Sequence, residues 1–352
     1  MRTRFLHKER NEFESFYVGH NRALVELARK DPRIVSCYGD FPPGEVGEVF
    51  SKEFPDRIID VGIAEGHLIT AAAGLADAGF IPFTHCHNLF ALGRGYNQIR
   101  HNLAYDNHNV KVVLCNSGMI WGAIGPSHLA VEDMAALRAV PNLVVLSPSD
   151  AVSSKKATFA SAEYVGPVML RLPSVADRFP VLYTEDLSFK IGKSIRLRDG
   201  KDVTIIATGI LAYDALVAAE ELEKEGIRAR VIDMHTVKPI DEGVILSAAK
   251  ETGAIVTVED ANILGGLGGA VAEVTAGKYP VWVERFGIKD VFGESGTSAE
   301  LKECFALTPS SIKRTVRSVL KSKTRHIARP KTTGAKKRAK RIGPGSDRRR
   351  RT

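Results

Sequence analysis

Glu65 is a residue whose type and surroundings suggest chemistry. It lies in the stretch DVGIAEGHLITAAAGLADAG, residues 60–79. Residues three, four and seven positions apart share one helix face, so a helix here groups Glu65 with Leu68, Ile69 and Ala72. A carboxylate on an apolar face is costly unless it is paired, which makes Glu65 a candidate for catalysis. The alternative is a capping or salt-bridged Glu near a helix start.

His128 is a second candidate, in the segment GPSH at residues 125–128. Ser127 is a favourable N-cap for a helix predicted over residues 127–140. His128 would then lie in the first turn of that helix, at a loop-to-helix junction where a side chain can face a cleft. An isolated histidine is more often structural, so the residue type alone does not decide its role.

The elements that must position these residues alternate between strands and helices. This alternation predicts α/β domains with mainly parallel sheets, because near-continuous apolar strands such as VKVVLCN suit a sheet covered on both faces. We expect a first domain at 1–175 with an N-terminal helix, a linker at 176–200 and a second domain at 201–320. The loop at 42–47 is rich in Gly and Pro.

The net charge of +8 comes from the end of the chain. Residues 321–352 hold 14 Lys or Arg and one acid, Asp347, so they carry +13 and the remainder carries −5. This tail has almost no large apolar residue, which predicts disorder. Such a basic tail can bind nucleic acid or an acidic partner, or it can be a solvated extension.

Composition suggests a globular chain, with 44% hydrophobic and 26% charged residues. No apolar run is long enough to cross a membrane, and the first residues contain no apolar core of a secretory signal. The four cysteines have no metal-ligand spacing, so we expect core thiols, no metal site in this chain and a cytoplasmic location.

Several motifs in order resemble the C-terminal half of transketolase-type enzymes, which depend on thiamine diphosphate. They cover roughly residues 15–320 and read DVGIAEGH, PFTHCHNLFALGRGYNQIR, GPSHLAVEDMAALRAVPNLVVLSPSD, VMLRLP, VIDMHTVKPID, VEDANILGGLGGAVAE and FGESGTSAEL. The resemblance implies a pyrimidine-binding domain followed by a transketolase C-terminal domain. It also implies a transferase that moves a two-carbon ketol unit from a ketose or sugar-phosphate-like substrate.

The resemblance also assigns roles to individual residues. Glu65 matches the Glu that hydrogen-bonds the aminopyrimidine of the cofactor, and Phe90 matches the aromatic residue that stacks on this ring. His128 matches a histidine that contacts donor oxygens and helps move protons. Arg171 matches a phosphate-binding Arg. His87, beside the stacking position, is either a polar lining residue of the substrate site or a loop histidine without chemistry.

Two further positions depart from the family pattern, and a third matches it. Ile124 stands where sugar-phosphate transketolases have an Asp that contacts a donor hydroxyl, and Asn116 stands at the position of a phosphate-contacting His. Both departures argue against the ordinary pentose-phosphate donor. Asp40 matches an acid at the subunit interface near the cofactor.

The diphosphate- and Mg²⁺-binding domain, with GDG and a downstream Asn, has no match in this sequence. The chain therefore resembles one subunit of a split enzyme, inactive without a separate diphosphate-binding subunit that holds Mg²⁺, and we expect a heterotetramer. Two alternatives stay open. One is a 2-oxoacid dehydrogenase β subunit or a deoxyxylulose-phosphate-synthase-like enzyme. The other is a non-catalytic scaffold or nucleic-acid-associated protein that uses the basic tail.

The cluster Gly265–Gly269 could suggest a nucleotide-binding site, but GGLGGAV is not a clean GxGxxG motif.

Overall fold

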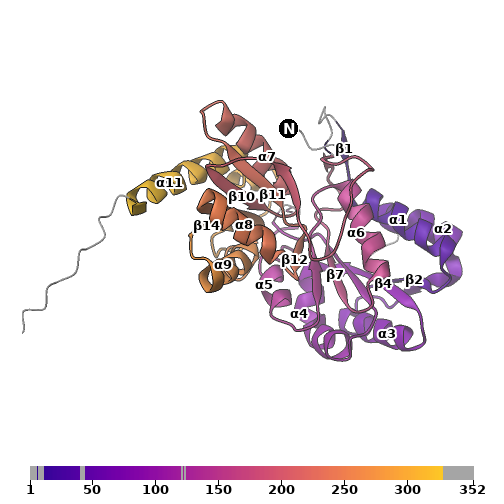
Figure 1. The fold of residues 1–352 in the computed structure, drawn as a ribbon. Helices are drawn as coiled ribbons and strands as arrows, with labels where there is room; N and C mark the ends of the chain where they lie inside the picture. The colour runs from indigo at the N-terminus through magenta and orange to yellow at the C-terminus, as the bar shows by residue number, and fades with distance from the viewer. Residues whose placement is uncertain (1–5, 7–11, 40–43, 120–121, 123, 328–352) are drawn as a thin grey trace, which may run out of the picture.

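The computed structural model describes residues 12–39, 44–119 and 124–327, together with Leu6 and Gly122. Two α/β domains follow one another along the chain, the first indigo to magenta and the second rose to yellow in Figure 1. This arrangement confirms the predicted fold class of two α/β domains with mainly parallel sheets. Asp40 and residues 328–352, which include most of the basic tail, lie outside the described residues.

The first domain is built on a sheet that has seven strands within the described residues, in the order β12-β6-β7-β5-β4-β2-β3. The strands are β2 (Ile34–Tyr38), β3 (Ile58–Asp60), β4 (Ile81–His87), β5 (Lys111–Cys115), β6 (Val144–Leu146), β7 (Val168–Arg171) and β12 (Thr236–Lys238). All neighbours pair in parallel except β12, which pairs antiparallel with β6. β12 comes from the second half of the chain, so the two domains share a sheet.

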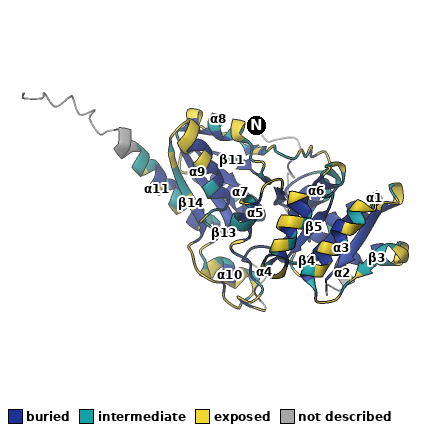
Figure 2. Cartoon of the chain, turned by 90° about the horizontal axis from the view of Figure 1, so that it is seen from below, coloured by how far each residue is buried: buried dark blue, intermediate teal, exposed yellow. Residues whose placement is uncertain are grey.

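Helices cover both faces of this sheet, which explains the continuous apolar strands. One face carries α1 (Phe16–Lys30) and α6 (Ala151–Glu163), and the other carries α3 (Glu65–Asp77), α4 (Asn88–Gln98), η2 (Ile99–Tyr105) and α5 (Asp133–Arg138). Side chains alternate along each strand, so Val113 packs in the core with Leu24 while Val112 and Leu114 pack with Leu68. Figure 2 shows the buried strands between helices whose outer sides are exposed.

The second domain has a five-stranded sheet in its described part, with the order β14-β13-β10-β11-β9. Its strands are β9 (Ile195–Arg198), β10 (Val203–Ala207), β11 (Ala229–Asp233), β13 (Ala254–Asn262) and β14 (Trp282–Ile288), and its helices are α7 (Leu211–Glu223), α8 (Glu242–Thr252), α9 (Leu267–Lys278), α10 (Ser298–Cys304) and α11 (Pro309–Ile327). Helices α8 and α9 pack against each other, as do α7 and α11.

Local features differ from the sequence-based expectations in several places. The range 176–200 is not free of regular structure, because β8 (Phe179–Pro180) pairs with β1 (Phe13–Glu14) and β9 joins the second sheet. Helix α2 (Gly44–Glu53) begins inside the segment expected to be a loop, and η1 (Pro55–Arg57) follows it.

The beginning of the basic tail is helical rather than disordered, because α11 continues to Ile327 and Lys323 Nζ donates to the carbonyls of Asp202 and Thr252. Helix α11 extends away from the second domain (Figure 1). No helix in the described part of the chain is long and apolar enough to span a membrane. Of the cysteines, Cys37, Cys86 and Cys115 are buried, whereas Cys304 is exposed and is not the core thiol we expected.

Candidate active site

The candidate residues gather at the carboxyl ends of the parallel strands in the first domain. Strand β2 pairs in parallel with β3 on one side and with β4 on the other, so successive strands are added to opposite sides of β2. Open α/β sheets bind ligands outside the carboxyl ends of the strands at such a switch point. Glu65 follows β3, and both His87 and Phe90 lie where β4 passes into α4.

Glu65 is the first residue of α3 and its side chain is only 3% exposed. As predicted from the helical spacing, Leu68, Ile69 and Ala72 are buried on the same side of the helix. The free N–H groups at a helix N-terminus stabilise a negative charge. Both carboxylate oxygens of Glu65 also lie 3.3 Å from Nη1 of Arg94, on α4. Glu65 is therefore a buried carboxylate held by a helix start and by one partly exposed cation.

Close packing of α3 against α4 brings Glu65 near Phe90. A Cβ atom added at Gly66 would lie 3.3 Å from the carbonyl oxygen of Arg94, so the two backbones approach closely at this point. The guanidinium carbon of Arg94 lies 4.4 Å from the centre of the Phe90 ring. Arg94 thus bridges the carboxylate of Glu65 and the aromatic face of Phe90.

Three aromatic side chains meet beside this carboxylate. The ring centres of Phe90 and His128 are 4.9 Å apart, those of His87 and His128 are 5.4 Å apart, and those of His87 and Phe90 are 5.6 Å apart. All three pairs have edge-to-face geometry, the arrangement that aromatic quadrupoles favour. The structure therefore brings together Glu65, Phe90, His87 and His128, although the sequence separates the first and last by 63 residues.

The local structure around His128 corrects one sequence-based expectation. Ser127 is not an N-cap, because α5 begins only at Asp133, and the His128 N–H donates to the carbonyl of Gly125 in a turn. Gly125 has φ of +82°, a conformation that favours glycine and that a helix start does not need. The Ser127 hydroxyl instead lies 2.9 Å from Nδ1 of His128. His128 is therefore presented by a tight turn rather than by a helix.

The second domain supports this turn. The Gly296 N–H donates to the carbonyl of Gly122 at 3.1 Å. A Cβ atom at Gly125 would lie 2.4 Å from the Ser295 hydroxyl, and one at Gly293 would lie 2.4 Å from a methyl of Leu129. This loop of the second domain, between β14 and α10, thus packs against the segment that carries His128.

Arg171 is buried and paired with carboxylates. Its side chain is 2% exposed and its Nε lies 2.6 Å from Asp133, while Nη1 contacts Asp260 at 3.4 Å and Ser147 at 3.0 Å. Burial alone would lower the pKa of Arg171, but the two carboxylates raise it above its ordinary value. Arg171 is thus engaged by carboxylates from both domains, and its phosphate contact stays a prediction.

The ion pairs of Arg171 reach the active site through one more side chain. Asn88, the first residue of α4, donates to Asp133 and also to the hydroxyl of Ser117 at 2.9 Å. Gly118 allows Asp260 to come close, because a Cβ atom there would lie 2.0 Å from an Asp260 carboxylate oxygen. Asp260, Arg171, Asp133 and Asn88 therefore connect the second domain to the start of the helix that bears Phe90.

The glycine cluster at 265–269 binds a carboxylate of this chain. Glu259 accepts hydrogen bonds from the N–H groups of Leu267 and Gly268, at 2.7 and 2.8 Å, at the start of α9. Burial raises the pKa of the Glu259 carboxyl to about 7, although these two N–H groups act to lower it. Because Glu259 fills the position that a phosphate would take at this helix start, the cluster is not a nucleotide site.

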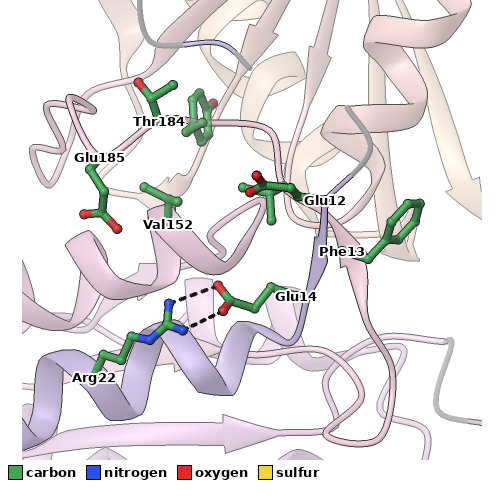
Figure 3. Close-up of a pocket in the computed structure, with 9 residues that line it drawn as sticks. Glu12, Phe13, Glu14, Arg22, Val152, Thr184 and Glu185 are labelled. Carbon is green, nitrogen blue, oxygen red and sulfur yellow. Dashed lines mark hydrogen bonds and ion pairs between the residues drawn. The ribbon is translucent and has the colours of Figure 1, made fainter. Parts of the chain in front are cut away.

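A surface pocket elsewhere in the first domain contains none of these residues. It lies between β1, α1 and α6 and is lined by Glu12, Glu14, Arg22, Val152 and Glu185 among others (Figure 3). Its Arg22 is paired with Glu14 at 2.9 Å, as the dashed lines in Figure 3 show. The described lining is acidic and its arginine is engaged, so this pocket is not part of the candidate active site.

Sequence reasoning missed the residues that hold the site together. Arg94 lies four positions after Phe90, a spacing that places two side chains on one helix face, so a signal for this pair was present. Asn88, Asp133 and Asp260 gave no such signal, because their contacts join segments far apart in sequence. Ile124, which stands at the family's donor-hydroxyl position, is exposed.

Comparisons with known proteins agree with this geometry. Residues 17–176 match the transketolase pyrimidine-binding domain, and residues 192–312 match the transketolase C-terminal domain. The chain is 42% identical over 303 residues to a 6-deoxy-6-sulfo-D-fructose transketolase subunit, SqwH, from Clostridium sp. (strain MSTE9), covering 85% of this chain and 92% of the relative. It is 41% identical over 304 residues to a putative transketolase C-terminal section from Methanocaldococcus jannaschii, covering 86% and 95%.

A solved structure described as a split gene transketolase, inactive beta4 tetramer, is also similar. Its TM-score is 0.82 at 40% identity, with 88% of this chain and 99% of that chain covered. Other relatives are named 1-deoxy-D-xylulose-5-phosphate synthase, and this chain spans about half of their length.

Fold, site and comparisons together define a transferase subunit with a pyrimidine-binding domain and a C-terminal domain. The chain belongs to the transketolase family and corresponds to the C-terminal subunit of a split transketolase. The family uses thiamine diphosphate, and split relatives of this kind imply a separate N-terminal subunit.

Proposed function

We propose that this chain transfers a two-carbon ketol unit at a site formed by Glu65, Phe90, His87 and His128, with a partner subunit that holds the diphosphate and Mg²⁺. The observation that carries the proposal is the buried Glu65 carboxylate beside the Phe90 ring. A planar nitrogen-bearing group, the Arg94 guanidinium, already contacts both. An aminopyrimidine ring needs the same two contacts, so the residues present fit the pyrimidine end of thiamine diphosphate.

Each residue has a defined task in this proposal. Bound thiamine diphosphate supplies the nucleophilic carbon and the electron sink of the reaction. Glu65 holds a proton at a ring nitrogen of the pyrimidine, and its burial keeps water from competing for that hydrogen bond. Phe90 fixes the plane of the ring. His128 and His87, which contact Phe90 edge to face, hold donor oxygens and exchange protons with them.

The donor in this proposal is a ketose whose acidic end is not held by Arg171. Asp133 and Asp260 engage that guanidinium in the interior, and Ile124 offers no hydrogen bond to a donor hydroxyl. The proposed donor class is a sulfonated or phosphorylated ketose. One relative is named for 6-deoxy-6-sulfo-D-fructose, so this sugar is a direct candidate for the donor.

Co-expression with a candidate diphosphate-binding transketolase subunit tests the proposal. The complex should bind thiamine diphosphate and transfer a ketol unit from a ketose, assayed with fructose 6-phosphate, xylulose 5-phosphate and 6-deoxy-6-sulfofructose as donors. Pyruvate serves as the donor for the alternative, synthase-like reaction. Glu65→Gln should lower turnover at least about 100-fold, as loss of a positioned proton-transfer group does, without changing assembly in gel filtration.

Asp77→Asn is the matched control for Glu65→Gln. Asp77 is an exposed carboxylate on the same helix, 2.9 Å from Nε2 of His108 and away from the site. Turnover of this variant should stay near the wild-type value. Near-wild-type activity in Glu65→Gln would remove Glu65 from the mechanism.

A further inference from the structure

Arg94 occupies the space between the two groups that the proposed cofactor site depends on. Its Nη1 lies 3.3 Å from both oxygens of Glu65, and its guanidinium carbon lies 4.4 Å from the centre of the Phe90 ring. Neither the family resemblance nor the comparisons give this residue a role.

The two contacts of Arg94 have the chemistry of the contacts that an aminopyrimidine needs. A guanidinium is planar, donates N–H groups to a carboxylate and stacks on aromatic faces. An aminopyrimidine is also planar and also combines a nitrogen contact with a stacked face. Arg94 already makes both contacts, so the guanidinium and the pyrimidine ring would compete for the same two residues.

The local structure allows Arg94 to leave this place. Its side chain is 52% exposed, whereas that of Glu65 is 3% exposed. A Cβ atom added at the adjacent Gly93 would meet no atom within 4 Å, so the surroundings of this turn are open. When Arg94 moves, Glu65 keeps the favourable field of the α3 N-terminus, which limits the cost of separating the pair.

We propose that Arg94 is an internal competitor for the pyrimidine site, which the cofactor ring must displace from Glu65 and Phe90 in order to bind. This inference rests on the proposed function, because it takes Glu65 and Phe90 as the pyrimidine contacts. Arg94 thereby sets the affinity of the site for the ring and keeps the buried carboxylate paired until the ring arrives.

The test measures ring binding rather than turnover. The full chain is titrated with thiamine, which carries the pyrimidine ring without the diphosphate, and binding is followed by saturation-transfer NMR on the pyrimidine proton. Arg94→Met keeps the length of the side chain but removes its charge and hydrogen bonds. We expect its dissociation constant to fall about fivefold to tenfold, since a partly exposed ion pair and a cation–π contact no longer have to be broken.

Arg100→Met is the matched control. Arg100 is an exposed arginine on the adjoining η2, and its Nη1 lies 3.0 Å from His101 rather than near Glu65. Its dissociation constant should equal that of the wild type. Arg94→Met combined with Phe90→Ala should lose the gain, because the ring then lacks its stacking surface.

The outcomes separate this inference from the proposed function. A dissociation constant for Arg94→Met that equals or exceeds that of the wild type, or no detectable binding by this variant, overturns the role of Arg94. If Glu65→Gln still abolishes ketol transfer in the complex, the proposed function survives that result. If the Glu65→Gln complex is active, the proposed function fails, regardless of the dissociation constant measured for Arg94→Met.

Discussion

Asn116 holds His87 by a side-chain hydrogen bond, with its Nδ2 3.1 Å from Nδ1 of His87. The other end of the amide is fixed, because Oδ1 of Asn116 accepts from the Val175 N–H at 3.0 Å and a backbone N–H can only donate. Nδ2 must therefore donate to His87, so Nδ1 of His87 is the acceptor and Nε2 carries the proton. The backbone at Asn116 has φ of +56°, which Asn tolerates better than most residues.

Asn116→Asp should reverse this tautomer. A carboxylate at this position can only accept, so Nδ1 of His87 must then carry a proton. The ¹⁵N chemical shifts of the His87 ring, measured in long-range ¹H–¹⁵N spectra, report the protonated nitrogen directly. Ser127→Ala is the control, because Ser127 contacts His128 and should leave the His87 shifts unchanged. Identical His87 shifts in wild type and Asn116→Asp would contradict the assignment.

Arg171→Met should destabilise the fold rather than weaken substrate binding. It leaves Asp133 and Asp260 buried without their cation, and breaking a buried pair in this way costs about 3–5 kcal/mol of unfolding free energy. Urea unfolding of the full chain measures the loss. Arg29→Met breaks an exposed pair with Glu53 and should cost at most about 1 kcal/mol. A variant with wild-type stability but a raised KM would restore Arg171 as a substrate contact.

Gly266→Ala should disrupt the start of α9. A Cβ atom at Gly266 would lie 1.9 Å from Oε2 of Glu259, so the carboxylate that caps the helix would have to move. We expect a loss of about 1–3 kcal/mol, the penalty for leaving hydrogen-bonding groups at a buried helix start unsatisfied, measured by urea unfolding. Gly277→Ala is the control. Gly277 lies on the same helix, and a Cβ atom added there would meet no atom within 4 Å, so this substitution should not destabilise the protein. Equal stability of the two variants would argue against the capping role.

A buried histidine pair makes the stability of the first domain sensitive to acid. His20 Nε2 lies 3.0 Å from His85 Nε2, His20 Nδ1 lies 2.8 Å from the Thr158 hydroxyl, and the His85 ring stacks on Tyr38. Burial lowers the pKa of His85 to about 4, and burial and then the neighbouring His85 lower the pKa of His20.

Because these folded-state pKa values lie below the unfolded value, the unfolded chain binds more protons in acid. The contribution of these two neutral histidines to the free energy of unfolding is therefore fully present above pH 6.5. It is lost as the pH falls from 6.5 towards 4. His85→Asn removes one of these groups, so its unfolding free energy should fall less between pH 7.5 and pH 5, by roughly 2 kcal/mol, than that of the wild type. Parallel pH profiles for the two proteins would show that His85 is not responsible.

The sequence by itself determined the face of α3 that carries Glu65, because side chains on one helix face repeat at fixed local spacings. It also determined the alternation of strands and helices, and it contains the motifs from which the roles of Phe90, His87 and His128 are predicted. The predictions from sequence were wrong where a segment's structure depends on residues far away along the chain. A helix start was predicted at Ser127 from local capping chemistry, but Gly125 and the second-domain loop form a turn there.

Only the tertiary structure decided which charges meet. Arg171 carries the same local motif whether it faces a phosphate or Asp260, and packing of the second domain places that carboxylate against it. In the same way, the pairing of Glu65 with Arg94 depends on how closely α3 and α4 approach at Gly66. Local spacing fixes the direction of a side chain relative to its own helix or strand. The partner it finds depends on segments brought together by burial of the cores.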